Sequence, residues 1–305
     1  SDSDNLAIKG VGYANKQKGN HIITGKIEEP AVLHTCQVLE KQGFEVTYLN
    51  VDKNGIVDLE QLNNAICPTT ILISIMFANN EIGTIQPIES IAKIARKHHI
   101  IFHTDAVQAI GNVKINVEQM QIDALSMSGH KFYAPKGVGV LYVKEGIEFE
   151  KIQDGGHQEN NKRAGTENVA EIVGLGKAIE SIYQQFEEYN QKLITLRDTY
   201  ITQVEKVIPN AKLNGDRTKR LPGNANFSFP NNDAQKLLFS LDEKGICASA
   251  GSACSTGSLE PSHVLTAIGL PSNLANGTLR ITFGKDNTME DVNYLVQSLK
   301  EIVQN

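Results

Sequence analysis

Cysteine is scarce in this sequence, and no cysteine pattern points to a disulfide framework or a metal site. The 305 residues include four cysteines, Cys36, Cys67, Cys247 and Cys254, with no C-x-x-C pair and no zinc-like spacing to histidine. A chain of this length can bury a core without cross-links, so we expect a reducing, cytoplasmic environment and free thiols. We predict no bound metal.

Long apolar runs and clusters of basic residues are also missing. No apolar run reaches the length of a membrane helix, and the polar start SDSDN does not resemble a signal peptide. The formal net charge is −6, without a Lys/Arg cluster. These absences argue against nucleic acid or an anionic membrane as the main partner.

What is present fits a globular protein, with 40% hydrophobic and 21% charged residues. Thr70–Phe77 is a continuous β-branched run, typical of a strand buried on both faces. An amphipathic helix is predicted at Ile88–His98 and another buried strand at Ile100–Ala106. This alternation predicts an α/β fold with a mostly parallel sheet and helices on both faces.

The second half of the chain has a different pattern. It is mostly helical from Thr166 to Val207, and strands are predicted within Pro222–Pro230 and Leu279–Phe283. Helices are predicted at Ala234–Lys244 and Glu290–Val303. We therefore expect a large domain over residues 1–185 and a smaller α+β domain over residues 186–305.

Polar residues follow the predicted strands of the large domain. Asn79-Asn80-Glu81 and Asp105 come at strand ends, and Lys131 lies just beyond the run ALSMS. Doubly wound sheets bind ligands beyond the carboxyl ends of their strands. The sequence therefore predicts a ligand site at this edge.

Lys131 and Asp105 suggest a particular chemistry. A desolvated lysine forms Schiff bases with carbonyl compounds. Pyridoxal phosphate needs such a lysine, a carboxylate for its pyridine nitrogen, and donors for its hydroxyl and phosphate. Asp105 and Gln108 lie in HTDAVQ, before Lys131 in SGHK. The alternatives are a solvated lysine in a turn and an aspartate that caps a helix.

Two residues of the second half are candidates for substrate chemistry. Cys254 lies in the small-residue loop ASAGSACSTG, where a thiol is either an exposed nucleophile or an unreactive surface group. Arg280 stands in an apolar strand, so it needs an anionic partner. That partner is either an internal carboxylate or the carboxylate of a substrate.

Six motifs in order resemble one family, and the resemblance covers essentially the whole chain. They are NNEIG (Asn79–Gly83), HTDAVQ (His103–Gln108), SGHK with YAPKGVG (Ser128–Lys131, Tyr133–Gly139), RAGTEN (Arg163–Asn168), GSACSTGSLEPSHVL (Gly251–Leu265) and LRITFG (Leu279–Gly284). Together they resemble the cysteine desulfurases of the nitrogenase-associated and iron–sulfur-cluster-assembly type. This resemblance implies class V aminotransferases with the large-domain fold of fold type I pyridoxal-phosphate enzymes.

The resemblance also implies roles at the cofactor. Lys131 would bond the cofactor aldehyde, Asp105 would pair with the pyridine nitrogen, and Gln108 and Asn80 would lie near the ring oxygen. The phosphate would be held by three further residues, Ser128, His130 and, from the partner subunit of a homodimer, Thr166.

For the substrate, the resemblance implies that Arg280 and Asn80 bind L-cysteine. Cys254 would take the sulfur as a persulfide and release L-alanine. Its long loop would carry the sulfur to an iron–sulfur scaffold or another acceptor protein. A selenocysteine lyase is an alternative on the same fold.

The chain departs from the family pattern at two places. Family members have a further N-terminal segment that ends in a phosphate-binding threonine, and Ser1 takes the position of that threonine. The family also places a histidine against the cofactor ring in an EHxAVL pattern, where this chain has Glu29. A truncated or inactive scaffold that dimerises or binds partners is therefore a further alternative to turnover.

Overall fold

The computed structural model describes residues 1–251 and 261–304, so the predicted nucleophile Cys254 lies outside the described residues. The chain divides into two compact units. Unit 1 comprises Ser1–Asn50, Val57–Ala78 and Gln86–Gln184. Unit 2 comprises Val51–Ile56, Asn79–Ile85 and Gln185–Asn305.

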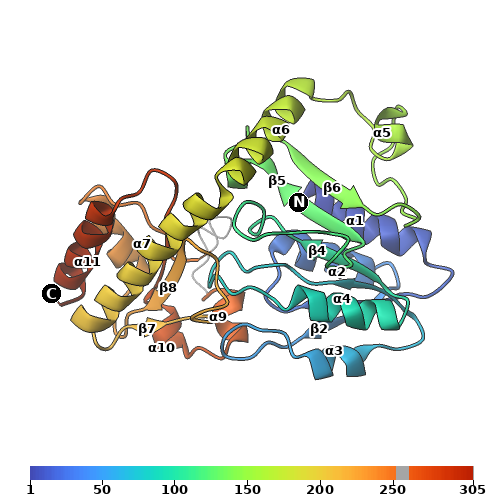
Figure 1. Cartoon of the computed structure of the whole chain (residues 1–305). Helices are drawn as coiled ribbons and strands as arrows, with labels where there is room; N and C mark the ends of the chain where they lie inside the picture. Colours follow the sequence, from blue (N-terminus) through green and yellow to red (C-terminus); the bar gives the residue numbers. More distant parts are fainter. Residues whose placement is uncertain (252–260, 305) are drawn as a thin grey trace. The chain divides into compact units, whose positions relative to one another are not determined.

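Unit 1 is built on a six-stranded sheet of order β2-β1-β3-β4-β5-β6 (Figure 1). All neighbours pair in parallel except β6, which is antiparallel to β5. The mostly parallel α/β sheet predicted from the sequence is thus confirmed. The strands are β1 (His21–Gly25), β2 (Glu45–Leu49), β3 (Thr70–Ser74), β4 (Ile101–Asp105), β5 (Ala124–Ser128) and β6 (Gly139–Val143).

Helices pack against this sheet. Helix α1 contacts α2 and strands β3 to β6, whereas α4 packs on β4. Every residue of β1 and β3 is buried, as expected for central strands of a parallel sheet. The helices of unit 1 are α1 (Asp2–Ala14), α2 (Pro30–Glu40), α3 (Leu59–Ala65), α4 (Ile88–Lys97), the 3₁₀ helix η1 (Gly129–Phe132), α5 (Gln158–Asn161) and α6 (Val169–Gln184).

Local sequence signals explain where these helices begin. Asp58 caps α3, because its carboxylate accepts the amide hydrogens of Glu60 and Gln61. Pro30 is the first residue of α2, where its missing N–H costs nothing. Both features can be read from the local sequence.

One strand is shorter than predicted. The run Thr70–Phe77 forms regular strand only to Ser74. Beyond that point the amide of Met76 donates to the buried carboxylate of Glu28 at 2.9 Å, instead of to a neighbouring strand. A side-chain acceptor thus replaces strand pairing at Met76, whereas the amides of Ile75 and Phe77 still donate to the carbonyls of His103 and Asp105. The apolar pattern of the segment gives no sign of this change.

Unit 2 contains a three-stranded antiparallel sheet of order β7-β8-β9. Tyr200 of α7 packs edge-on against Phe227 and Phe283, with ring centroids 5.9 and 5.7 Å apart. The two-residue strand β7 was not predicted. The elements are α7 (Phe186–Val207), β7 (Lys212–Leu213), β8 (Asn224–Ser228), α8 (Ala234–Asp242), α9 (His263–Ala267), α10 (Ser272–Ala275), β9 (Thr278–Thr282) and α11 (Met289–Gln304).

Among the helices that the structure describes, none combines the length and apolar character needed to cross a bilayer.

Candidate functional site

The predicted cofactor residues of unit 1 gather at the carboxyl ends of two neighbouring strands. Asp105 is the last residue of β4, and it pairs in register with Ser126 of the parallel strand β5. Strand β5 ends at Ser128, and η1 follows with Lys131 in its single turn. The sheet topology therefore places Asp105 and the SGHK segment at the same edge.

Asp105 is a buried carboxyl group, with 5% of its surface exposed. Its Oδ1 accepts the amide hydrogen of Val107 at 2.9 Å, a local bond into the turn that follows β4. Residues 107–112 form turns, so Asp105 does not cap a helix, which was the alternative role. Burial raises the pKa of Asp105 well above its usual value, and the negative charge of Asp4 raises it further. A cationic partner at this carboxylate would relieve both effects.

Asp4 is a buried acidic residue that the sequence reasoning missed. Its side chain is 1% exposed, and Oδ1 lies 4.0 Å from Nε2 of His103 without a hydrogen-bond partner among the residues described. The signal was present, because Asp4 shares the buried side of α1 with Ile8 and Val11. An acidic residue on a buried helix face often has a function.

The side chain of His103 forms hydrogen bonds with both neighbouring strands. Its Nδ1 lies 2.9 Å from Oγ of Ser74 on β3, and its Nε2 lies 3.0 Å from Oγ of Ser126 on β5. Burial lowers the pKa of His103 to about 4, so the imidazole is neutral at physiological pH. The neutral ring bridges two serine hydroxyls near Asp105, which is a structural role.

The SGHK segment provides hydroxyl, imidazole and ammonium groups within one short turn. Oγ of Ser128 lies 3.0 Å from Nδ1 of His130. Partial burial lowers the pKa of His130, and the positive charges of Lys131 and Lys136 lower it further. Lys131 is exposed. The local field is therefore positive, which favours an anion such as a phosphate group.

The remaining predicted residues of unit 1 lie at different depths. Gln108 is partly buried just after β4, and its carbonyl accepts a hydrogen bond from Asn112 at 3.0 Å. Thr166 is exposed in the segment between α5 and α6. Neither has a described contact with Asp105 or the SGHK segment.

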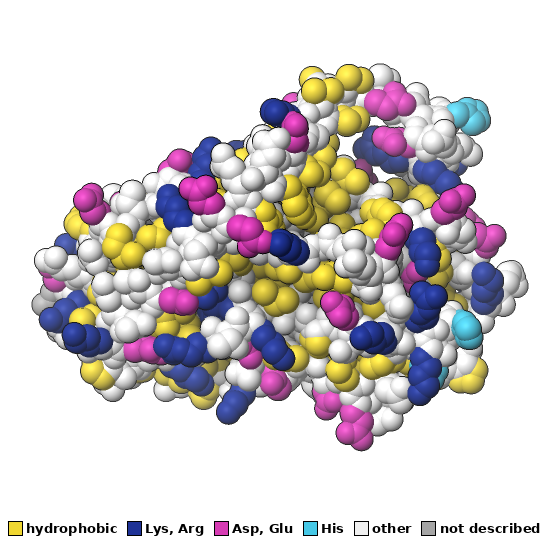
Figure 2. Space-filling view, viewed as in Figure 1, with side chains coloured by type: hydrophobic (Ala, Val, Ile, Leu, Met, Phe, Trp, Pro, Cys, Tyr) yellow, Lys and Arg dark blue, Asp and Glu magenta, His cyan; other side chains and the backbone are white. Residues whose placement is uncertain are grey.

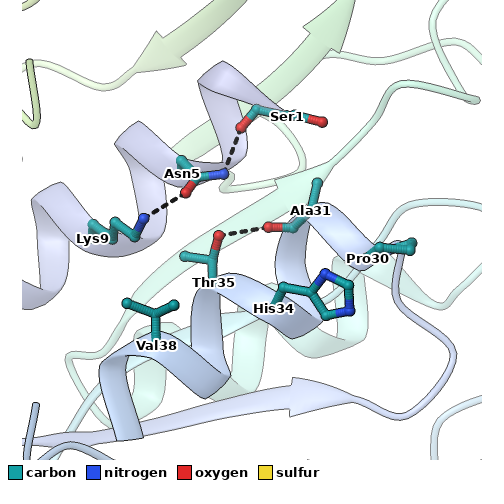
Figure 3. Close-up of a pocket in the computed structure, with 8 residues that line it drawn as sticks. All are labelled: Ser1, Asn5, Lys9, Pro30, Ala31, His34, Thr35 and Val38. Atoms are coloured by element: carbon teal, nitrogen blue, oxygen red, sulfur yellow. Dashed lines mark hydrogen bonds between the residues drawn. The ribbon is translucent and has the colours of Figure 1, made fainter. Parts of the chain in front are cut away.

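A pocket of about 340 Å³ lies between α1 and α2, and Ser1 is among its lining residues (Figure 3). The carbonyl of Ser1 accepts a hydrogen bond from Asn5 at 2.9 Å. Glu29 stands at the position of the family's histidine. It is the N-cap residue of α2, directly before the lining residue Pro30, and it is partly buried. The pocket is lined by Ser1, Asn5, Lys9, Pro30, Ala31, His34, Thr35 and Val38.

In unit 2, the two predicted substrate residues lie together. Nη1 of Arg280 on β9 donates to the backbone carbonyl of Asn80 at 3.3 Å. The two residues are 200 positions apart in sequence. The same carbonyl accepts a second hydrogen bond, from Nδ2 of Asn224 at 3.2 Å. A cationic side chain is thus held beside the Asn79–Ile85 loop.

Two asparagines of β8, which the sequence reasoning missed, also contact the Asn79–Ile85 loop. Nδ2 of Asn224 also reaches the carbonyl of Glu81 at 3.3 Å, and Nδ2 of Asn226 donates to it at 3.1 Å. Gly83 permits this close approach, because its φ is +77° and a Cβ there would lie 2.5 Å from Oδ1 of Asn224. The alternating pattern N-A-N-F-S was the available signal.

The described residues just before the Cys254 loop are anchored beside Arg280. The amide of Ser249 donates to the carbonyl of Arg280 at 3.2 Å, and the amide of Arg280 donates back at 2.6 Å. Oγ of Ser249 also donates to the carbonyl of Gly251 at 3.0 Å. The loop that contains Cys254 therefore begins next to the strand that carries Arg280.

The other cysteines differ sharply in environment. Cys36 is fully buried, and burial raises the pKa of its thiol to about 12. Cys67 is exposed, with Sγ 3.2 Å from Oγ1 of Thr69 and 3.4 Å from Oγ1 of Thr70. Burial is the largest single influence on Cys67 and raises the pKa of its thiol, but the hydrogen bonds from both hydroxyls and from the amide of Thr69 together outweigh it and lower the pKa.

We therefore expect iodoacetamide to alkylate Cys67 on the order of 10³-fold faster than Cys36 at pH 7.5, because only the exposed thiolate reacts. Peptide mass spectrometry over a time course measures both rates. In guanidinium chloride the two rates should converge. Equal rates in the native protein would show that the thiol environments described here are wrong.

Residues 1–295 of the chain match the aminotransferase class-V family. The chain is 56% identical to "Cysteine desulfurase IscS" of Clostridium botulinum over 306 residues, which cover 100% of this chain and 77% of that protein. It is also 56% identical to "Cysteine desulfurase IscS" of Methanosarcina thermophila, covering 100% of this chain and 75% of that protein.

Solved structures show the same similarity. A "NifS-like protein" superposes with a TM-score of 0.92 at 36% identity, covering 99% of this chain and 80% of that chain. The structure entitled "SspA in complex with cysteine" superposes with a TM-score of 0.78 at 39% identity, covering 93% of this chain and 79% of that chain.

Proposed function

Because the chain belongs to the cysteine desulfurases of the aminotransferase class-V family, we propose that it converts L-cysteine to L-alanine and transfers the sulfur onward. The observation that carries this proposal is the match of the whole chain to cysteine desulfurases, and the strand-end position of Asp105 and the SGHK segment supports it. The chain is a pyridoxal-phosphate-dependent enzyme of the α/β class.

The residues of unit 1 fit pyridoxal phosphate. Asp105 is a buried carboxyl group whose pKa is raised by burial and by Asp4, and a protonated pyridine nitrogen beside it would offset both effects. Ser128, His130 and nearby lysines form a positive turn that suits a phosphate. When bound, pyridoxal phosphate withdraws electrons from the substrate carbon, so that the carbon–sulfur bond can break.

We assign the remaining roles in unit 1 as follows. Lys131 would hold the cofactor covalently and move the proton at the substrate carbon, because it is the one amine of the SGHK turn. Asp105 would keep the ring nitrogen protonated, and Gln108 would contact the ring oxygen. Ser1 takes the place of a phosphate-binding threonine. Unit 1 is thus proposed as the cofactor-binding domain.

In unit 2, Arg280 and Asn80 are proposed to bind the substrate. A guanidinium recognises a carboxylate through a planar pair of N–H donors. The hydrogen bond to the Asn80 carbonyl orients the plane of the Arg280 guanidinium. Arg280 therefore suits the α-carboxylate of L-cysteine, and Asn80 lies next to it.

Cys254 is proposed as the nucleophile that receives the sulfur. Its thiolate attacks the substrate Sγ, a sulfur–sulfur bond forms, and the carbon–sulfur bond breaks. The electron pair stays on the substrate carbon, which takes a proton and leaves as L-alanine. The net change is Cys254–SH plus L-cysteine to Cys254–S–SH plus L-alanine, and no external oxidant is needed.

We propose that the enzyme works as a homodimer, in which Thr166 reaches the phosphate of the partner subunit. Helix α6 supports this, because Val169 and Val173 are 65% and 66% exposed at the end nearest Thr166. Figure 2 shows apolar side chains gathered at the uppermost end of α6. Apolar residues exposed together in this way typically mark a protein interface.

Substituting aspartate at Val173 is expected to shift a dimer toward monomer, since a buried unpaired charge is costly at an interface. Size-exclusion chromatography with light scattering measures the mass. Tyr294→Asp, at an exposed apolar residue of unit 2, is the matched control and should leave the mass unchanged. A monomeric parent protein would contradict the dimer proposal.

The onward partner is proposed to be an iron–sulfur scaffold or another sulfur-acceptor protein, met in the cytoplasm. The relatives give no support to an inactive scaffold or a selenocysteine lyase over the desulfurase function. Because Glu29 stands where the family has a histidine, the inactive-scaffold alternative is tested directly by measuring turnover.

The proposal is tested by incubating cofactor-loaded protein with L-cysteine and dithiothreitol. We expect L-alanine and sulfide in equal amounts, and no pyruvate. L-serine serves as the control substrate, because it lacks a transferable sulfur. Pyruvate with sulfide would indicate elimination instead, and absence of any product would favour the inactive scaffold.

A further inference from the structure

Strand β8 has two buried faces of opposite character. Ala225 and Phe227, and Phe229 just beyond the strand, belong to the hydrophobic core of unit 2. Asn224, Asn226 and Ser228 alternate with them and therefore point to the other side of the sheet. These three side chains, here called the polar face of β8, are at most 3% exposed. Burying such a face is costly unless every group is bonded.

Each side chain of the polar face of β8 makes at least one hydrogen bond, although Oδ1 of Asn224 has no described hydrogen-bond partner. Oγ of Ser228 lies 2.7 Å from Oγ1 of Thr278. Nδ2 of Asn214 reaches both Ser228 and Oδ1 of Asn226 at 2.8 Å. Accepting from Asn214 fixes the orientation of the Asn226 amide, so that its Nδ2 faces the carbonyl of Glu81.

This chain of hydrogen bonds ends at the predicted substrate residues. Asn226 pairs directly with Arg280 across the β8–β9 ladder. Asn226 and Asn224 hold the carbonyl of Glu81, and Asn224 and Arg280 hold the carbonyl of Asn80. The same face thus sets the position of the Asn79–Ile85 loop and the direction of the Arg280 guanidinium.

We infer that Asn226 is a positioning residue for substrate recognition, which holds Arg280 and Asn80 as one unit that binds the α-carboxylate of the amino-acid substrate. The inference rests on the proposed role of Arg280. Asn226 does not contact the reacting atoms in this account. It acts by fixing the carbonyl of Glu81, the residue after Asn80, whose own carbonyl accepts the hydrogen bond of the guanidinium.

The test compares Asn226→Ala with Ser228→Ala. Both remove a fully buried polar group from the same face. Among the described residues, the Ser228 hydroxyl bonds Asn214 and Thr278 and not the Asn79–Ile85 loop, so its loss leaves the bonds to the loop in place. We expect Asn226→Ala to raise KM for L-cysteine about tenfold with little change in kcat. Ser228→Ala should lower the melting temperature by about as much as Asn226→Ala does, but it should leave the KM for L-cysteine unchanged. Asn226→Ser, too short to reach Glu81, replaces the alanine variant if that variant does not fold.

Two competitive inhibitors separate positioning from general damage. 3-Mercaptopropionate keeps the carboxylate of cysteine without its amine, whereas cysteamine keeps the amine without the carboxylate. In Asn226→Ala, the inhibition constant of 3-mercaptopropionate should rise about tenfold and that of cysteamine should not change. Equal changes for both inhibitors, or equal KM shifts in the two variants, would overturn the inference.

Arg280→Ala distinguishes failure of the inference from failure of the proposed function. Arg280→Ala should raise the inhibition constant of 3-mercaptopropionate more than Asn226→Ala does. If Arg280→Ala shows this loss and Asn226→Ala does not, only the positioning role is wrong. If Arg280→Ala leaves both inhibitors unaffected, the role of Arg280 itself is wrong, and the inference fails with it.

Discussion

Replacing Lys131 with alanine is expected to abolish the visible absorption of protein-bound pyridoxal phosphate and to reduce L-alanine formation on the order of 10³- to 10⁴-fold. Lys131 is the amine of the SGHK turn, at the same strand-end edge as Asp105. Without it the cofactor has no covalent anchor, and no group remains to move the substrate proton.

Lys136 provides the matched control, because it is an exposed lysine in the neighbouring segment and also contributes positive charge at His130. Lys136→Ala should keep the absorption band and most of the activity. An absorption band that survives in Lys131→Ala, or one that is lost only in Lys136→Ala, would contradict the assignment of Lys131.

Replacing Cys254 with serine is expected to leave the cofactor absorption intact and to reduce sulfide release to background. Serine is nearly isosteric, but its oxygen cannot accept a sulfur atom to give a persulfide. Persulfide formation is measured by tagging the protein after turnover without reductant and mapping the modified peptide by mass spectrometry. The parent protein should carry the extra sulfur on Cys254.

Cys247→Ser is the control for this experiment. Cys247 is a free, exposed thiol only a few residues earlier in the chain, so general thiol reactivity would affect it as well. We expect its replacement to leave persulfide formation unchanged. If sulfide release continues in Cys254→Ser but stops in Cys247→Ser, the nucleophile is Cys247 and not Cys254.

The fold was predictable where one local pattern dominates. Continuous β-branched runs gave the central strands, and the cap at Asp58 and the proline at position 30 gave helix starts. The strand-end positions of Asp105 and Lys131 also followed, because parallel strands align their carboxyl ends. These features depend on residues close together in sequence or on general rules of sheet topology.

Features that depend on distant contacts were not predictable. Asn224 and Asn226 look like ordinary strand residues until their partners in the Asn79–Ile85 loop are known, and those partners lie 143 to 145 positions away. Asp4 likewise gains meaning only beside His103. The loss of strand pairing at Met76 depends on the carboxylate of Glu28, which the apolar pattern of that strand does not show.

The most direct test of the account is to reduce cofactor-loaded protein with sodium borohydride and map the pyridoxyl group by mass spectrometry. Reduction makes the lysine linkage permanent, so the modified peptide identifies the anchor without reference to activity. The account predicts a single modified lysine, Lys131, in the peptide that contains SGHK. Modification of another lysine, or no modification in protein saturated with pyridoxal phosphate, would contradict it.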